Sequence, residues 1–168
     1  MTETILGIHS NVKSGNKSGG HAWITVTTRG KTSHYGLWPD DHPDVVDNGD
    51  GTDIREGMES FDRPAASRYY KLTDTQIAEL NGYLGHNITW KLTNNCSSWA
   101  SYVVLKVVGE DVDADDNWAL GMETPRELGR NIALLEAKSP TAYMLPKDMT
   151  AAKIDANPRA PSSKSSSK

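Results

Sequence analysis

The sequence has a single cysteine among its 168 residues, and this excludes an intramolecular disulfide. Its 36% of hydrophobic residues can form one core at this length, whereas two domains of ordinary size would need a longer chain. No hydrophobic run approaches the roughly 18 residues that a membrane-spanning helix needs. We therefore expect a single domain over residues 1–156 and no membrane insertion.

Basic residues are too few to form a nucleic-acid surface. Lys and Arg number 18 against 22 Asp and Glu, which gives a net charge of −4. The Lys and Arg residues before residue 157 do not cluster into a basic stripe. Nucleic acid is therefore not an expected partner. The last segment, residues 157–168, is rich in Ser, Lys and Pro, and such a composition predicts a disordered tail.

Several motifs of known enzyme sites are also missing. The sequence has no G-x-S-x-G elbow, no P-loop and no dinucleotide fingerprint, so it does not indicate a serine hydrolase or a nucleotide-binding protein. It has no H-E-x-x-H or C-x-x-C motif. A calcium loop around residues 47–53 would place Val46 and Gly57 where carboxylates are needed. We expect no metal and no cofactor.

The residues that are present predict an α+β fold. Residues 21–28 and 32–38 are rich in β-branched and aromatic side chains, and the turn at Arg29-Gly30 makes them a β-hairpin. Residues 68–72 and 88–92 are also strand-like. Helix-start signals occur at Thr73 with Gln76, at Asn94 or Asn95 before residues 96–108, and at Thr124 before Pro125.

Cys96 is the candidate nucleophile, because it stands at the start of the helix predicted over residues 96–108. The free N–H groups and partial positive charge of a helix N-terminus favour a thiolate and lower the pKa of a thiol. The same N–H groups can donate to a developing oxyanion. The alternative interpretation is a small buried hydrophobic residue, which is the usual role of an isolated cysteine.

A thiolate nucleophile needs a general base within hydrogen-bonding distance, and this base is usually histidine. Of the five histidines, His21 is the strongest candidate, because it follows Gly19-Gly20 and begins a strand that would mount the imidazole rigidly. Of the others, His42 and His86 lie in turn-like contexts. The sequence therefore predicts a Cys96–His21 pair.

A third residue should orient the imidazole, and the hairpin register helps to choose it. With a tight turn at Arg29-Gly30, His34 lies opposite Thr25, which is about 13 Å along the strand from His21. Asp40 is diagonal to His21 on the same face, within about 7–8 Å between backbones. We therefore predict Asp40 as the orienting residue, although a β-bulge would restore His34.

The histidine hairpin precedes the cysteine helix, which reverses the order found in papain. The segments GGHAWITV (19–26), HYGLWPD (34–40), NNCSSWASYV (94–103) and TPRELGRNI (124–132) resemble the circularly permuted papain-like hydrolases related to NlpC/P60 amidases. More narrowly, they resemble the peptidoglycan amidase effectors that bacteria deliver by type VI secretion. The resemblance implies an antiparallel sheet packed against helices, with Cys96 as nucleophile and His21 as base. Families of this kind usually have a third polar residue on the strand after the base.

The resemblance also implies a substrate, partners and a location. The substrate would be the peptide stem or cross-link of peptidoglycan, and a cognate immunity protein and a secretion apparatus would be partners. The N-terminal residues lack a basic segment followed by an apolar one, so the sequence predicts no Sec signal. We expect synthesis in a bacterial cytoplasm and delivery to the periplasm of target cells.

The tryptophans near the predicted site are candidates for substrate binding, with core packing as the alternative. They are Trp23, Trp38 and Trp99. Two other functions stay open at this point. One is a lipid-directed acyltransferase or thioesterase of the same fold, and the other is a non-catalytic binding module in which Cys96 is buried.

Overall fold

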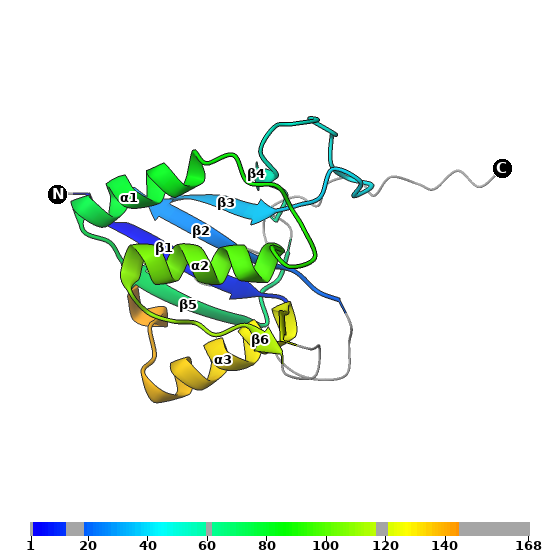
Figure 1. Cartoon of the computed structure of the whole chain (residues 1–168). Coiled ribbons are helices and arrows are strands. Elements are labelled where there is room, and N and C mark those ends of the chain that lie inside the picture. The colour runs from blue at the N-terminus through cyan, green and yellow to red at the C-terminus, as the bar shows by residue number, and fades with distance from the viewer. Residues whose placement is uncertain (1, 13–18, 60–61, 117–120, 145–168) are drawn as a thin grey trace.

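A central antiparallel sheet organises the computed structural model, which describes residues 2–12, 19–59, 62–116 and 121–144 (Figure 1). Within this part of the chain the strand order is β4-β3-β2-β1-β5, and neighbouring strands are antiparallel. The strands are β1 (Thr4–Ser10), β2 (Ala22–Thr28), β3 (Lys31–Leu37), β4 (Ile54–Glu56) and β5 (Ala66–Lys71). The segment predicted as a disordered tail, residues 157–168, lies outside the described residues.

The hairpin of β2 and β3 forms in the predicted register. Thr28 pairs with Lys31, and Thr25 lies opposite His34. The turn residues Arg29-Gly30 both have positive φ angles, 54° and 73°. This combination suits the right-handed twist of a two-residue hairpin. The predicted tight turn is therefore confirmed.

The sequence pattern did not reveal β1 and β4. β1 lies between β2 and β5 and is buried along its whole length, so it lacks the polar–apolar alternation that marks a half-buried strand. β4 has only three residues, inside a polar and Gly/Asp-rich segment, and its Ile54 pairs with Leu37 of β3. Both strands matter for the site, because β1 supports β2 and β4 leads the chain to Glu59.

The helices begin where the cap residues predict. In α1 (Asp74–Leu84), α2 (Cys96–Val108) and α3 (Pro125–Lys138), the cap side chains accept hydrogen bonds from N–H groups of the first turn. None of the described helices is both long and apolar enough to cross a membrane. The shorter elements are β6 (Asp115–Asp116), β7 (Met122–Glu123) and the 3-10 helix η2 (Ala142–Met144).

The strand predicted over residues 88–92 is wrong, because side chains take the hydrogen bonds that a ladder would need. The N–H of Trp90 donates to Asp53 Oδ2 at 2.6 Å, and the N–H of Ile88 donates to Thr52 Oγ1 at 3.3 Å. Asp53 N–H in turn donates to the Ile88 carbonyl at 2.7 Å. These bonds fix the segment that leads into α2 beside the start of β4.

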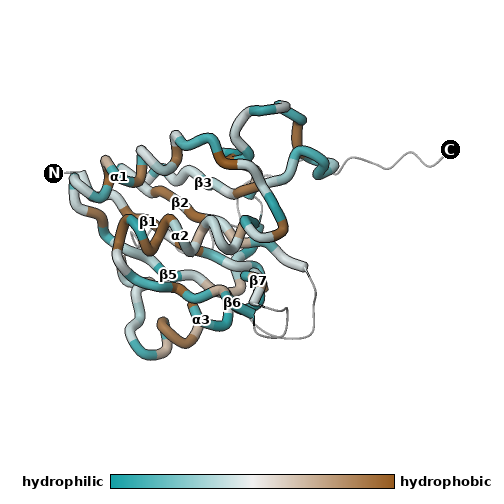
Figure 2. The backbone as a smooth tube through the Cα atoms, viewed as in Figure 1, coloured by the Kyte–Doolittle hydropathy of each residue, from teal (hydrophilic) through white to brown (hydrophobic). Residues whose placement is uncertain are grey.

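The helices lie on one side of the sheet (Figures 1 and 2). Residues of both layers make up the hydrophobic core. α2 packs on β2 and β3, α3 packs on β5 and β1, and α1 packs on α2. Because successive side chains of a strand point to opposite faces, Ala22 and Ile24 face this core whereas Trp23 and Thr25 face the other side. This second side of the sheet carries buried aromatic and polar residues that lie around the candidate active site.

Candidate active site

The cap of α2 fixes Cys96 at the first position of the helix. The side-chain oxygen of Asn95 accepts hydrogen bonds from the N–H groups of Ser97 (2.9 Å) and Ser98 (3.3 Å). Ser98 Oγ accepts from the Asn95 N–H at 2.8 Å, and the Asn95 amide donates to the Glu123 carbonyl at 2.8 Å. Cys96 therefore lies at the positive end of the helix dipole, with an N–H that no helical carbonyl accepts.

Asn11, which directly follows β1, holds both the N–H and the carbonyl of His21. The His21 N–H donates to Asn11 Oδ1 at 2.7 Å, and the His21 carbonyl accepts from the Asn11 N–H at 3.1 Å. The preceding residue, Gly20, has a φ angle of 111°, and a Cβ at this position would overlap Val12. Glycine is therefore required for the chain to turn into β2, and the imidazole is mounted rigidly.

Cys96 and His21 are electrostatically coupled, and each is 8% exposed. Burial alone would lower the pKa of His21, but hydrogen bonds with Cys96 and Glu59 outweigh it and raise the pKa to about 9. Burial alone would raise the pKa of the Cys96 thiol, but the hydrogen bond and charge of His21, together with the Ala22 N–H, lower it. Both shifts favour a thiolate–imidazolium pair.

Glu59 binds the other side of the imidazole. Glu59 Oε1 accepts a hydrogen bond from His21 Nε2 at 2.7 Å, and the Glu59 side chain is completely buried. The indole Nε1 of Trp38 donates to the same oxygen. Since Nε2 is engaged by Glu59, Nδ1 is the ring nitrogen left to exchange a proton with Cys96. Cys96, His21 and Glu59 thus form a chain of thiol, imidazole and carboxylate.

Gly36 of β3 makes room for the contact between Glu59 and His21. A Cβ at this position would overlap Glu59 Oε1 and would lie 2.8 Å from His21 Nε2. Gly36 is not among the glycines with a positive φ angle, so its backbone conformation is open to other residues. The site therefore requires glycine here for space alone.

Asp40, the predicted orienting residue, binds Arg55 instead of His21. Asp40 Oδ1 accepts from Arg55 Nη2 at 2.5 Å and from the Asn48 N–H at 3.3 Å. The prediction of Asp40 was wrong because β3 ends at Leu37, after which the chain leaves the strand direction assumed in the register argument. Glu59 occupies the position on the imidazole that we assigned to Asp40.

The buried His9 and the half-buried His34 lie on the second side of the sheet. His34 lies opposite Thr25, as predicted, and burial lowers its pKa against the opposing charge of Glu59. His9 is held at Nδ1 by Ser67 and at Nε2 by Thr25, each at 2.8 Å. Burial and the charge of His34 lower the pKa of His9 to about 3, so its imidazole is neutral at ordinary pH.

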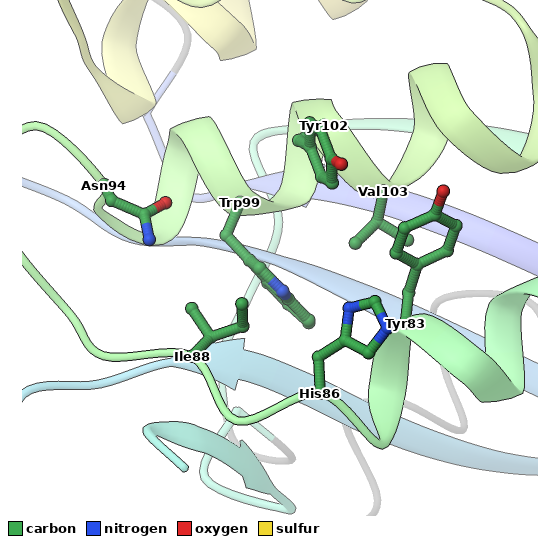
Figure 3. A pocket seen from close by; sticks show the side chains of 7 residues that line it. All are labelled: Tyr83, His86, Ile88, Asn94, Trp99, Tyr102 and Val103. Carbon is green, nitrogen blue, oxygen red and sulfur yellow. The ribbon is translucent and has the colours of Figure 1, made fainter.

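The three tryptophans predicted to bind substrate occupy different environments. Trp23 is 1% exposed, and its ring stacks on both His9 and His21, with centroid distances of 5.3 and 6.0 Å. Trp38 lies against the His21 ring at 4.1 Å. Trp99 points from α2 into a pocket (Figure 3). Trp23 and Trp38 therefore surround the imidazole, and Trp99 forms part of a separate concave surface.

The pocket at Trp99 lies between the end of α1, the segment that leads into α2 and α2 itself (Figure 3). It has a volume of about 240 Å³. Its lining residues are Tyr83, His86, Ile88, Asn94, Trp99, Tyr102 and Val103. Trp99 and Cys96 are three residues apart on the same helix, so the pocket begins about one turn from the candidate nucleophile.

The chain was compared with families and proteins that are already known. No family model matches it. No curated protein and no solved structure matches it either. Among the residues that the structure describes, no group of three or more His, Cys, Asp or Glu side chains could hold a metal ion.

We predict that the Cys96 thiolate forms at a pH below the ordinary thiol range, which is about 8.5. The thiolate should be visible by its ultraviolet absorbance, with Cys96→Ala as the blank, since the chain has no other cysteine. In His21→Ala the thiolate should appear only above the ordinary range, because burial raises the pKa of the Cys96 thiol and the imidazole no longer lowers it. A wild-type thiol that ionises only above the ordinary range would contradict the pair.

Proposed function

We propose that the chain is a cysteine-dependent hydrolase of the permuted papain-like class that cleaves amide bonds in the peptide part of peptidoglycan. The observation that carries the proposal is the buried chain of Cys96, His21 and Glu59, with the nucleophile at a helix start. The α+β fold, with its antiparallel sheet on one side of the helices, is compatible with this class. The substrate rests on the resemblance of segments 19–26 and 94–103 to peptidoglycan amidases.

The proposed reaction has two steps. The Cys96 thiolate attacks the carbonyl carbon of the amide, and the N–H of Cys96 at the start of α2 donates to the oxyanion. The His21 imidazolium gives its proton to the leaving amine, the C–N bond breaks and a thioester forms. His21 then takes a proton from water as the water attacks the thioester, the C–S bond breaks, and the carboxylic acid leaves while the Cys96 thiolate and His21 imidazolium are restored. Glu59 stabilises the imidazolium in both steps.

We also propose that the protein acts as an antibacterial effector, delivered by a type VI apparatus to the periplasm of target cells and neutralised in the producer by an immunity protein. This part of the proposal rests on the resemblance alone. A pull-down of the product of a neighbouring gene with the wild-type protein, and inhibition of hydrolysis by that product, would test it.

The central experiment is digestion of purified peptidoglycan. We expect the wild-type protein to release peptide fragments with one new amine and one new carboxylate, which mass spectrometry identifies together with the bond that is cut. Rapid alkylation of Cys96 in the folded protein should accompany this activity. If the folded protein releases no fragments and its thiol reacts only after denaturation, Cys96 is a packed residue of a non-catalytic module.

A further inference from the structure

We propose that Trp38 is a positioning residue, which acts through Glu59 to hold the His21 imidazole in the orientation that Cys96 needs. The inference rests on the proposed cysteine hydrolase and deepens it. It assigns to Trp38 a role different from the substrate binding that its place in the sequence suggested.

The Glu59 carboxylate is held through only one of its two oxygens. Both N–H donors, His21 Nε2 and Trp38 Nε1, bind the same oxygen, Oε1. The other oxygen, Oε2, is buried and has no hydrogen-bond partner in the described part of the chain. A buried carboxylate depends strongly on the few hydrogen bonds that it makes. The Trp38 N–H therefore fixes which way Oε1 points, and Oε1 in turn fixes the imidazole.

Trp38 itself is held by its backbone and by its ring. Its backbone N–H donates to the Asp53 carbonyl at 3.0 Å, directly before β4. Its ring packs between His21, at 4.1 Å, and His42, at 4.6 Å. Trp38 thus joins the end of β3 to the start of β4, the strand that leads to Glu59. An indole against the imidazole also favours the protonated ring.

Several charged and titratable groups surround the His21 imidazole. Cys96 faces His21 from α2, whereas Glu59 and Asp62 act on it from the segment after β4. His34 of β3 is close enough for the charge of Glu59 to act on its pKa, and its Nδ1 is buried without a hydrogen-bond partner among the described residues.

Trp38→Phe tests the inference, because it keeps an aromatic ring against His21 and removes only the N–H donor. We expect the pH of thiolate formation to rise by about one unit, which is a tenfold loss of thiolate below the transition. We expect kcat for amide hydrolysis to fall about tenfold while KM changes little. Trp90→Phe is the matched control, because the Trp90 backbone, and not its indole, binds Asp53. This control should leave both quantities unchanged.

A double-mutant cycle decides whether Trp38 acts through Glu59. In the Glu59→Ala background, which has no acceptor for the Trp38 N–H, Trp38→Phe should have no further effect on kcat or on thiolate formation. A rise in KM with kcat and the thiolate titration unchanged would make Trp38 a substrate-binding residue and would overturn the inference. Equal effects of Trp38→Phe with and without Glu59 would overturn it too.

One measurement needs no variant and so does not depend on the folding of Trp38→Phe. In the wild-type protein, the Trp38 indole N–H resonance should lie downfield, as expected for a donor to a carboxylate, and should shift when the Cys96–His21 pair titrates. An indole resonance whose chemical shift stays constant through this titration would contradict the inference. If the pair titrates normally but Trp38→Phe has no effect, only the role of Trp38 fails. If the wild-type thiol shows no early titration, the proposed hydrolase fails with it.

Discussion

Replacing Cys96 by alanine should abolish amide hydrolysis. In the proposed reaction the sulfur is the atom that forms the covalent bond to the substrate. The loss should be on the order of 10⁶-fold in kcat, the scale found when the nucleophile of a catalytic triad is removed, which brings the rate to background. Cys96→Ser should be almost as inactive, because a hydroxyl is not ionised under conditions in which the thiol is. Fragment release from purified peptidoglycan is the assay for both variants.

The fold of Cys96→Ala should be intact, because the cap of α2 is built by Asn95 and Ser98 rather than by the sulfur. Circular dichroism and thermal unfolding should therefore resemble those of the wild type. The pKa of His21 should fall from about 9 in this variant, since Cys96 is one of the groups that raise it, and NMR titration of the imidazole measures the change. Fragment release by Cys96→Ala at a rate near that of the wild type would show that Cys96 is not the nucleophile.

The elements that the sequence predicts correctly are those with local signals. The caps at Thr73, Asn95 and Thr124 satisfy N–H groups within the next three residues, so their side chains mark a helix start wherever the helix packs. The hairpin is equally local, because the turn at Arg29-Gly30 sets the register of β2 and β3. Cys96 begins one of these well-marked elements, and His21 directly precedes another.

Glu59 was missed because its position depends on contacts that are distant in the sequence. β4 is too short to show a pattern, and it is a strand only because Ile54 and its neighbours pair with β3. A polar segment without a strand pattern therefore contains the turn that returns a carboxylate to His21. The available signal was Gly36, a glycine inside a β-strand, which often marks a close approach of another group. In this protein that group is the carboxylate of Glu59.

Gly36→Ala should disable the site with a single methyl group. The added Cβ would overlap Glu59 Oε1 and crowd His21 Nε2, so the carboxylate must move away from the imidazole. We expect kcat/KM to fall on the order of 10²-fold, the effect of misplacing a catalytic group by about 1 Å. The pKa of His21 should fall as well, because its hydrogen bond to Glu59 contributes to the raised value. The pH of thiolate formation should rise accordingly.

The matched control is Gly82→Ala in α1, where a Cβ meets no atom within 4 Å. This variant should keep full activity and should be slightly more stable, because alanine is the better helix former. Restoring space at the site should restore function: in Gly36→Ala with Glu59→Asp, the shorter side chain withdraws the carboxylate from the new methyl group. We expect the double variant to be more active than Gly36→Ala alone. If Gly36→Ala hydrolyses peptidoglycan as the wild type does, the contact between Glu59 and His21 does not support catalysis.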